Sequence, residues 1–442
     1  MNTLFFLSAL LFGWLAYNCY YPVYRRPRLA IFSFLAGWLT GELALHHILF
    51  QATLVFLFIW SGSVEGFSGA IAFAIYVISW IALTHFYLTG YRAKGAVNQS
   101  LTDALGQHYI DQISELDKTN LVDSPDYHQI KRPRKNIDPR VEVIKNLRFG
   151  NHGQKLDLYR HRQPSTIDDS HPDDEAVLPV LLQIHGGAWT EKIGSKNEQA
   201  IPLMNHMALQ NWICVSINYR LSPTATFPEH IIDCKEGLAW VKSHIQEYGG
   251  DPDFIVVTGG SAGGHLSSLV ALTPNDPNFQ PGFEDIDTSV QGAVPFYGVY
   301  DFTNKYDMQN NHGLMTLLEK SVLKKRQDQD PETYEAASPL FRISPAAPPF
   351  FIIHGDKDTL VPVAEARMFA KTLGEVSDNP VAYAEIEGGQ HAFDMFASVR
   401  SEYVKLGVAK FLVYLHAQHK TKASANQSLT SVTSSAPPQT QG

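Results

Sequence analysis

Three long apolar stretches dominate the first ninety residues of the chain. Residues 2–21 carry no charged side chain and end in a cluster of tyrosines, which is typical of a membrane span with an interfacial aromatic belt. A cleaved signal peptide fits less well, because no lysine or arginine precedes this stretch and no small-x-small site ends it. Residues 29–60 and 67–89 are the other two apolar stretches. The pattern therefore predicts a helical transmembrane region over residues 1–95 with three spans.

The second stretch is interrupted by polar residues near its middle. Its first part, residues 29–40, is only 12 residues long, short of the ~20 that a membrane-crossing helix needs. One long, tilted or bent helix is predicted instead, with Gly37 and Gly41 near the bend. Glu42 and His46 lie one helical turn apart and could pair inside the bundle. For this pair, polar packing between helices is favoured over a functional site.

Two segments without strand-like patterning flank the remaining part of the chain. Residues 96–140 are predicted to be a linker that contains a basic run at 131–135 and one amphipathic helix, marked by Leu101, Leu105, Ile110 and Ile113. Residues 419–442 are rich in Ser, Thr and Gln and lack apolar periodicity, which predicts a disordered tail.

Between these segments, over residues 141–418, apolar runs of strand length alternate with helical patterns. A hairpin is predicted first, then an acidic surface loop at 161–175. The predicted strands lie at 141–149, 155–159, 178–184, 212–217, 254–258, 291–297, 350–354 and 381–386. This alternation predicts an α/β fold with a mostly parallel central sheet and helices on both faces. Residues 301–345 interrupt this alternation of strands and helices, and the segment is long enough to form a cap-like insertion over a pocket.

The composition argues against several classes of function. The net charge of −9 does not favour nucleic acid as the main partner. The three cysteines, Cys19, Cys214 and Cys234, are widely spaced and form neither a disulfide framework nor a Cys-x-x-Cys spacing. The chain has 18 histidines but no His-Glu-x-x-His, so neither a catalytic metal nor another cofactor is expected.

The strand at 254–258 leads into the most informative motif of the chain. Gly259-Gly260-Ser261-Ala262-Gly263 fits G-x-S-x-G, a strand-to-helix turn that lifts a serine hydroxyl above a sheet edge. Flanking glycines suit such a turn, because its strained backbone leaves no room for Cβ atoms. The alternative is a glycine-rich turn whose serine hydroxyl has no catalytic role. A phosphate loop is disfavoured, because no Gly-Lys-Ser/Thr occurs in the chain.

An activated serine needs a base, an orienting acid and oxyanion donors, and each has a candidate directly after a predicted strand. Gly186 and Gly187 follow the strand at 178–184. Asp356 and Asp358 follow the strand at 350–354, so two acids are possible. His391 follows the strand at 381–386. Because parallel strands end at one edge of a sheet, these groups are expected to meet there, in the chain order Ser, Asp, His.

These motifs resemble those of the α/β-hydrolase superfamily, in particular the hormone-sensitive-lipase-like carboxylesterases with an HGG oxyanion motif. The resemblance covers about residues 141–416 and includes His185-Gly186-Gly187, Asn218-Tyr219-Arg220-Leu221-Ser222-Pro223, Gly250-Asp251-Pro252 and Val294–Asp301 (VPFYGVYD). It implies the following roles: Ser261 as nucleophile, His391 as base, Asp358 as orienting acid, and the backbone of Gly186, Gly187 and Ala262 as oxyanion donors. The third glycine of the family motif is Ala188 in this chain.

The sequence therefore predicts a membrane-anchored serine carboxylesterase with a small-molecule or lipidic ester as substrate. Two alternatives stay open: an amidase or arylformamidase that uses the same triad, and an inactive hydrolase scaffold that binds a partner at the membrane. The basic residues near the spans are Arg25, Arg26, Arg28, Arg92 and Lys94. Three spans place all of them on one side, so the catalytic domain is expected on the cytoplasmic side of a bacterial inner membrane.

Overall fold

The computed structural model describes residues 2–62, 64–119, 121–133, 137–162 and 177–434. Within them, one sheet has eight strands in the order β1-β2-β4-β3-β5-β6-β7-β8. The strands are β1 (Val141–Phe149), β2 (Gln154–His161), β3 (Leu178–Ile184), β4 (Ile213–Ile217), β5 (Gly250–Gly260), β6 (Gly292–Phe296), β7 (Phe350–Gly355) and β8 (Val381–Ile386). β2 pairs antiparallel with β1 and β4, and the remaining pairs are parallel. The predicted α/β fold is confirmed.

Helices cover both faces of this sheet because alternate strand residues are apolar on both sides. On β5, Ile255 and Val257 join the core on one face, while Phe254 and Val256 join the core on the other. The first face is covered by α9 (Glu229–His244), α10 (Ala262–Leu272) and α13 (Val363–Val376). The second is covered by α5 (Arg92–Leu105), α8 (Ile201–Leu209) and α14 (Val399–Ser434). Cys214 and Cys234 are fully buried in these two cores.

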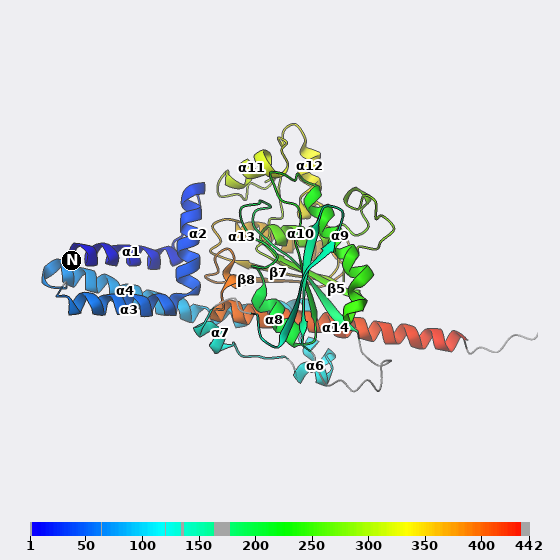
Figure 1. The fold of residues 1–442 in the computed structure, drawn as a ribbon, viewed down its shortest axis with the longest axis horizontal. Helices are drawn as coiled ribbons and strands as arrows, with labels where there is room; N and C mark the ends of the chain where they lie inside the picture. Colours follow the sequence, from blue (N-terminus) through cyan, green and yellow to red (C-terminus); the bar gives the residue numbers. More distant parts are fainter. Residues whose placement is uncertain (1, 63, 120, 134–136, 163–176, 435–442) are drawn as a thin grey trace, which may run out of the picture.

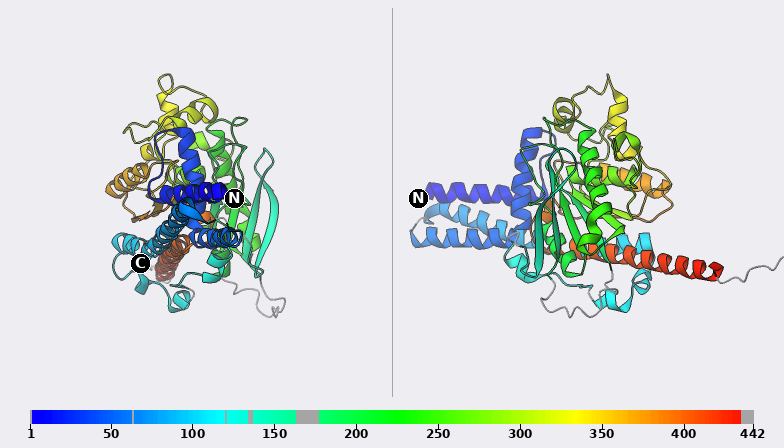
Figure 2. Two further views of the ribbon diagram at one scale, coloured as in Figure 1. Left: turned by 90° about the vertical axis from the view of Figure 1, so that its left-hand side faces the viewer. Right: turned by 45° about the vertical axis from the view of Figure 1, so that its right-hand side comes forward.

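The N-terminal helices form a bundle that projects from the sheet domain (Figures 1 and 2). They are α1 (Asn2–Tyr20), α2 (Pro27–Glu42), α3 (Ala44–Trp60) and α4 (Gly66–Thr89). In the figures α1, α3 and α4 run side by side, whereas α2 stands across their end, between the bundle and the sheet domain. The break between α2 and α3 is at Leu43, and the two helices meet at 88°.

Two of the described helices are long and apolar enough to cross a membrane, namely Asn2–Tyr20 and the continuous helix Gly66–Leu105. The bent pair α2 and α3 gives a third candidate if it is one span. The sequence predicted a bend in residues 29–60 near Gly37 and Gly41. The structure places it at Leu43 and makes it nearly a right angle, so α2 does not continue the direction of α3.

Two other local predictions differ from the structure. The linker helix ends at Leu105, because Gly106 leaves the helix with a φ of +93°, and Ile110 lies in a separate 3₁₀ turn, η1 (Tyr109–Gln112). Residues 419–434, predicted as disordered, continue α14. Parts of three other predicted segments lie outside the described residues: the basic run at 131–135, the acidic loop at 161–175 and the end of the tail.

Short helices and turns complete the described chain. The insertion at 301–345 contains α11 (Gly313–Leu317), a π-helical turn η4 (Leu318–Val322), α12 (Pro331–Ala336) and η5 (Pro339–Phe341). The others are α6 (Glu115–Thr119), α7 (Tyr127–Lys131), η2 (Ile245–Tyr248), η3 (Pro277–Phe279) and η6 (Phe393–Met395). In Figure 1 the insertion lies above the sheet, near the upper end of α2.

Candidate active site

Ser261 stands at the sharp turn between β5 and α10. Its φ of +59° lies in the left-handed region, which a non-glycine residue adopts only under constraint from its surroundings. The neighbouring glycines supply that constraint, because a Cβ on Gly263 would lie 2.1 Å from the carbonyl oxygen of Ile184. The backbone N–H of Ser261 also donates to the carbonyl of Phe296 at 3.0 Å. The turn therefore fixes the hydroxyl above the carboxyl edge of the sheet.

The side chains of Ser261, His391 and Asp358 form one continuous chain of hydrogen bonds. Nε2 of His391 lies 2.8 Å from Oγ of Ser261, and Nδ1 lies 2.7 Å from Oδ2 of Asp358. The three groups come from the ends of β5, β8 and β7, as expected for a parallel sheet. This geometry lets the imidazole accept the serine proton while the carboxylate holds its other nitrogen.

Asp358 is held by a dense set of donors. Oδ1 accepts the backbone N–H groups of Leu360 at 2.9 Å and Val361 at 2.8 Å, and Oδ2 also lies 3.1 Å from Nε2 of His354. Burial alone would raise the pKa of this carboxyl group. The charge of His391 and the hydrogen bonds from both histidines outweigh burial and lower the pKa below its ordinary value. Asp358 is therefore ionised at neutral pH.

The second candidate acid, Asp356, does not reach His391. Its Oδ1 accepts the backbone N–H of Gly388 at 2.6 Å, and Lys357 lies 3.9 Å from its Oδ2. Asp356 thus ties the β7 loop to the loop that carries His391. Burial raises the pKa of its carboxyl group.

The three predicted oxyanion donors are not equivalent in the structure. Gly186 packs against Ser261, since a Cβ on this glycine would lie 3.1 Å from Cβ of the serine. Its N–H already donates to Oε1 of Gln199 at 2.6 Å. Among the described residues, the N–H groups of Gly187 and Ala262 have no such acceptor. Gly187 has a φ of +122°, and a Cβ there would collide with the carbonyl of Ile193.

Comparison with known proteins identifies the family of this chain. A family model described as BD-FAE matches residues 169–373. The chain is 53% identical over 275 residues to the probable carboxylic ester hydrolase LipM of Mycobacterium tuberculosis, and 41% identical over 350 residues to esterase LipQ of the same organism. These alignments cover 62% of this chain and of LipM, and 77% of this chain and 79% of LipQ. The chain belongs to the carboxylic ester hydrolases of the α/β-hydrolase superfamily.

Solved structures agree with this assignment of the fold. The propionate-bound thermophilic esterase Est2 of Thermogutta terrifontis is 25% identical, with a TM-score of 0.50. The superposition covers 64% of this chain and 96% of that chain. A sarin-phosphonylated form of the same esterase gives a TM-score of 0.51 over 62% of this chain and 95% of that chain, at 24% identity.

Two described side chains of the hydrolase domain, neither with a role in the sequence analysis, also contact the candidate triad. One is His354, which shares Asp358 with His391 and also lies 3.1 Å from the carbonyl of Val361. The other is Tyr297, whose ring lies 4.7 Å from the His391 ring and whose hydroxyl donates to Asp394. His354 lies near the carboxyl end of β7 and Tyr297 directly follows β6, and this position at a strand end is the sequence signal that could have marked them.

Glu42 and His46, considered as a possible pair in the sequence, have other partners in the structure. Glu42 contacts the hydrolase domain instead, where its carboxylate accepts from Nη1 of Arg400 at 2.8 Å and from Oγ of Ser398 at 2.6 Å. His46 lies 3.2 Å from the carbonyl of Lys131. The sequence distance of more than 350 residues between Glu42 and Arg400 explains why periodicity could not reveal this contact.

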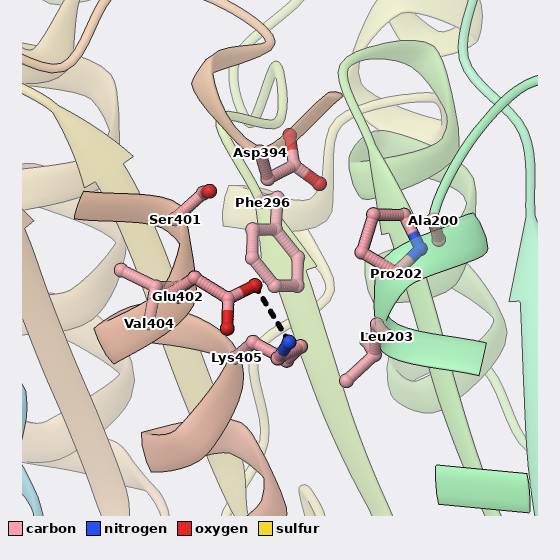
Figure 3. A pocket seen from close by; sticks show the side chains of 9 residues that line it. All are labelled: Ala200, Pro202, Leu203, Phe296, Asp394, Ser401, Glu402, Val404 and Lys405. Atoms are coloured by element: carbon pink, nitrogen blue, oxygen red, sulfur yellow. Dashed lines mark hydrogen bonds and ion pairs between the residues drawn. The ribbon is translucent and has the colours of Figure 1, made fainter. Parts of the chain in front are cut away.

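A small cavity lies apart from the candidate triad, between α8, β6 and α14 (Figure 3). Its lining includes Phe296, Asp394 and an ion pair in which Nζ of Lys405 lies 2.6 Å from Oε1 of Glu402. None of Ser261, Asp358 and His391 lines it. Glu402 also accepts the backbone N–H of Asp126, so both of its carboxylate oxygens have partners within the fold.

Proposed function

We propose that this chain is a membrane-anchored serine carboxylesterase that works through an acyl-enzyme on Ser261. The observation that carries the proposal is the hydrogen-bond chain from Ser261 through His391 to Asp358 at the carboxyl edge of the sheet. The names of the relatives support an ester as the substrate.

In the proposed mechanism, Oγ of Ser261 attacks the ester carbonyl carbon while Nε2 of His391 takes its proton. The negative charge on the carbonyl oxygen faces the N–H groups of Gly187 and Ala262, and the N-terminus of α10 adds a favourable dipole. His391 then gives the proton to the departing alkoxide. Water deacylates the enzyme by the same steps, with His391 again as base. Ionised Asp358 stabilises the imidazolium throughout.

A covalent labelling experiment tests this proposal. A fluorophosphonate probe is expected to label the detergent-solubilised full-length protein at Ser261, because phosphonylation needs the same activated hydroxyl. In parallel, p-nitrophenyl esters from acetate to palmitate should be hydrolysed, and the chain-length optimum would define the acyl preference. A protein that neither takes the label nor hydrolyses any of these esters would instead be a catalytically inactive scaffold.

The membrane part of the proposal places the hydrolase domain in the cytoplasm. Arg25, Arg26 and Arg28 lie between α1 and α2, and Arg92 and Lys94 lie just after α4. With α1, α3 and α4 as spans, both basic groups lie at the end of the bundle next to the hydrolase domain. The N-terminus is then outside.

Fusions to the C-terminus test this orientation. A green fluorescent protein fusion is expected to fluoresce, and an alkaline phosphatase fusion is expected to be inactive, because that enzyme needs the oxidising periplasm. An active phosphatase together with a dark fluorescent fusion would reverse the proposed orientation. Western blots of both fusions control for expression.

A further inference from the structure

Helix α2 has an orientation that fits the membrane surface rather than its interior. It meets α3 at 88° and stands across the end of α1, α3 and α4, the helices proposed as spans (Figures 1 and 2). A helix perpendicular to such spans lies parallel to the bilayer plane. Asn18 of α1 fixes α2 in place, since it donates to the carbonyl of Ser33 at 2.8 Å and accepts its hydroxyl at 2.6 Å.

The inner face of α2 contacts both loops that carry the base and the acid. Nε1 of Trp38 donates to the carbonyl of Ala392 at 2.8 Å, next to His391. Oγ1 of Thr359, next to Asp358, donates to the carbonyl of Ala30 at 3.1 Å. The ring of Phe34 stands edge-on to the His391 ring at a centroid distance of 6.0 Å. Helix α2 is thus a wall of the active site.

The outer face of α2 is apolar and exposed. Phe32 is 65% exposed and Ile31 is 51% exposed, and the same face carries Leu29, Leu35 and Leu39. These five side chains follow helical spacing, and the exposed residues Arg25, Arg26 and Arg28 lie at the N-terminal end. An exposed apolar face with arginines at one end suits a position at the lipid interface, where the apolar side chains enter lipid and the arginines meet lipid phosphates.

Both ends of α2 are fixed to the hydrolase domain. At the N-terminal end, Nδ2 of Asn311 in the insertion donates to the carbonyl of Tyr24 at 2.8 Å. At the C-terminal end, Glu42 is buried in its ion pair with Arg400, which also donates to the carbonyl of Glu387 at 2.8 Å. Helix α2 is therefore docked on the hydrolase domain at both of its ends.

The chemistry of the reaction indicates which part of the substrate this wall meets. His391 delivers its proton to the oxygen of the departing alcohol, so the alcohol must lie beside Nε2 of the imidazole. Phe34 stands beside that ring and is half-buried, between the catalytic histidine and the lipid-facing side of α2. The alcohol portion of the ester and the bilayer surface thus lie on the same side of the triad.

We propose that α2 forms the alcohol-side wall of the active site, and that the enzyme takes esters whose alcohol portion is an amphiphile dissolved in the bilayer. The substrate slides along α2 from the membrane surface, so its apolar chain stays in lipid while the ester bond reaches Ser261. Phe34 contributes to the affinity for this chain. The inference rests on the proposed esterase function, and its tests are chosen to separate the two.

The first test compares two acetate esters that differ in their alcohol. The full-length protein in phosphatidylglycerol–phosphatidylcholine vesicles is assayed on hexadecyl acetate, as acetate release, and on p-nitrophenyl acetate. Phe34→Ala is expected to lower the ratio of kcat/KM for hexadecyl acetate to kcat/KM for p-nitrophenyl acetate at least about 10-fold. Both esters transfer the same acetyl group to the enzyme, but only the hexadecyl chain needs the apolar wall. Phe56→Ala is the matched control, since Phe56 is 66% exposed on α3, away from His391.

The outcomes of this test separate the two proposals. A ratio that falls in Phe34→Ala and stays within about twofold in Phe56→Ala supports the wall. An unchanged ratio in Phe34→Ala, with full fluorophosphonate labelling of both variants, overturns it while the esterase proposal stands. Absence of both labelling and hydrolysis in the wild-type protein rejects the esterase proposal and, with it, the substrate assigned to the wall.

A second test measures the environment of α2 without using activity. A nitroxide label is attached at Phe32→Cys, on the outer face, and at Val177→Cys, which is 45% exposed at the opposite, amino-terminal end of β3. Cys19, Cys214 and Cys234 are buried, which directs the label to the new cysteine. In vesicles, the label at position 32 is expected to collide more with oxygen than with a water-soluble nickel complex, and the label at 177 the reverse. Nickel-dominated relaxation at position 32 would show that α2 is not in lipid and would overturn the proposal.

Discussion

Replacing Ser261 with alanine is expected to lower kcat for p-nitrophenyl butyrate by at least about 10⁴-fold. The substitution removes the atom that would bond to the acyl carbon, and no other hydroxyl occupies the position 2.8 Å from Nε2 of His391 in the described part of the chain. The fold should be little affected, because the turn depends on neighbouring glycines and on the backbone bond to Phe296. The measurement is initial rate in detergent, with the melting temperature as a check on folding.

Ser268→Ala is the matched control for this variant. Ser268 lies two turns further along α10 and donates its hydroxyl to the carbonyl of Gly264 at 2.7 Å, away from the imidazole. The same chemical change there should leave kcat within a few-fold. If Ser261→Ala kept more than a few per cent of the wild-type rate after repurification, the nucleophile would lie elsewhere.

The hydrolase fold and the meeting of the candidate triad could be predicted from the sequence because their signals are local. Each strand is a short apolar run, and in a parallel sheet every carboxyl end lies at the same edge. Ser261, Asp358 and His391 lie in the turns or loops that follow such runs, so their meeting follows from strand direction. The identity of the acid needed more, because Asp356 and Asp358 both follow β7.

The arrangement of the N-terminal region depends on contacts that no local pattern records. Periodicity marked residues 29–60 as apolar, but an apolar run by itself does not show where a helix bends or how its two parts are oriented. What turns α2 by 88° is its docking through Trp38, Ala30 and Glu42 on residues more than 300 positions away. The occupied N–H of Gly186 is a similar case, since its partner Gln199 lies in a loop without regular pattern.

The two acids on the β7 loop offer the sharpest comparison of roles. Asp358→Asn is expected to lower kcat by about 10⁴-fold, because an amide can donate to Nδ1 of His391 and so favours the tautomer whose Nε2 cannot accept the serine proton. Asp356→Asn is the matched control. Its amide oxygen can still accept the N–H of Gly388, so kcat should stay within about 10-fold of wild type.

Stability should respond to both substitutions, so rate and melting temperature must be measured together. In the folded protein the pKa of Asp358 is lowered. Its ionised form therefore stabilises the fold at pH values above its ordinary pKa of about 4. This contribution is lost as the pH falls through the lower pKa of the folded protein. Asp358→Asn should therefore melt earlier than wild type at pH 7, with the difference shrinking towards acid pH. A large loss of kcat in Asp356→Asn with near-wild-type kcat in Asp358→Asn would reverse the assignment of the acid.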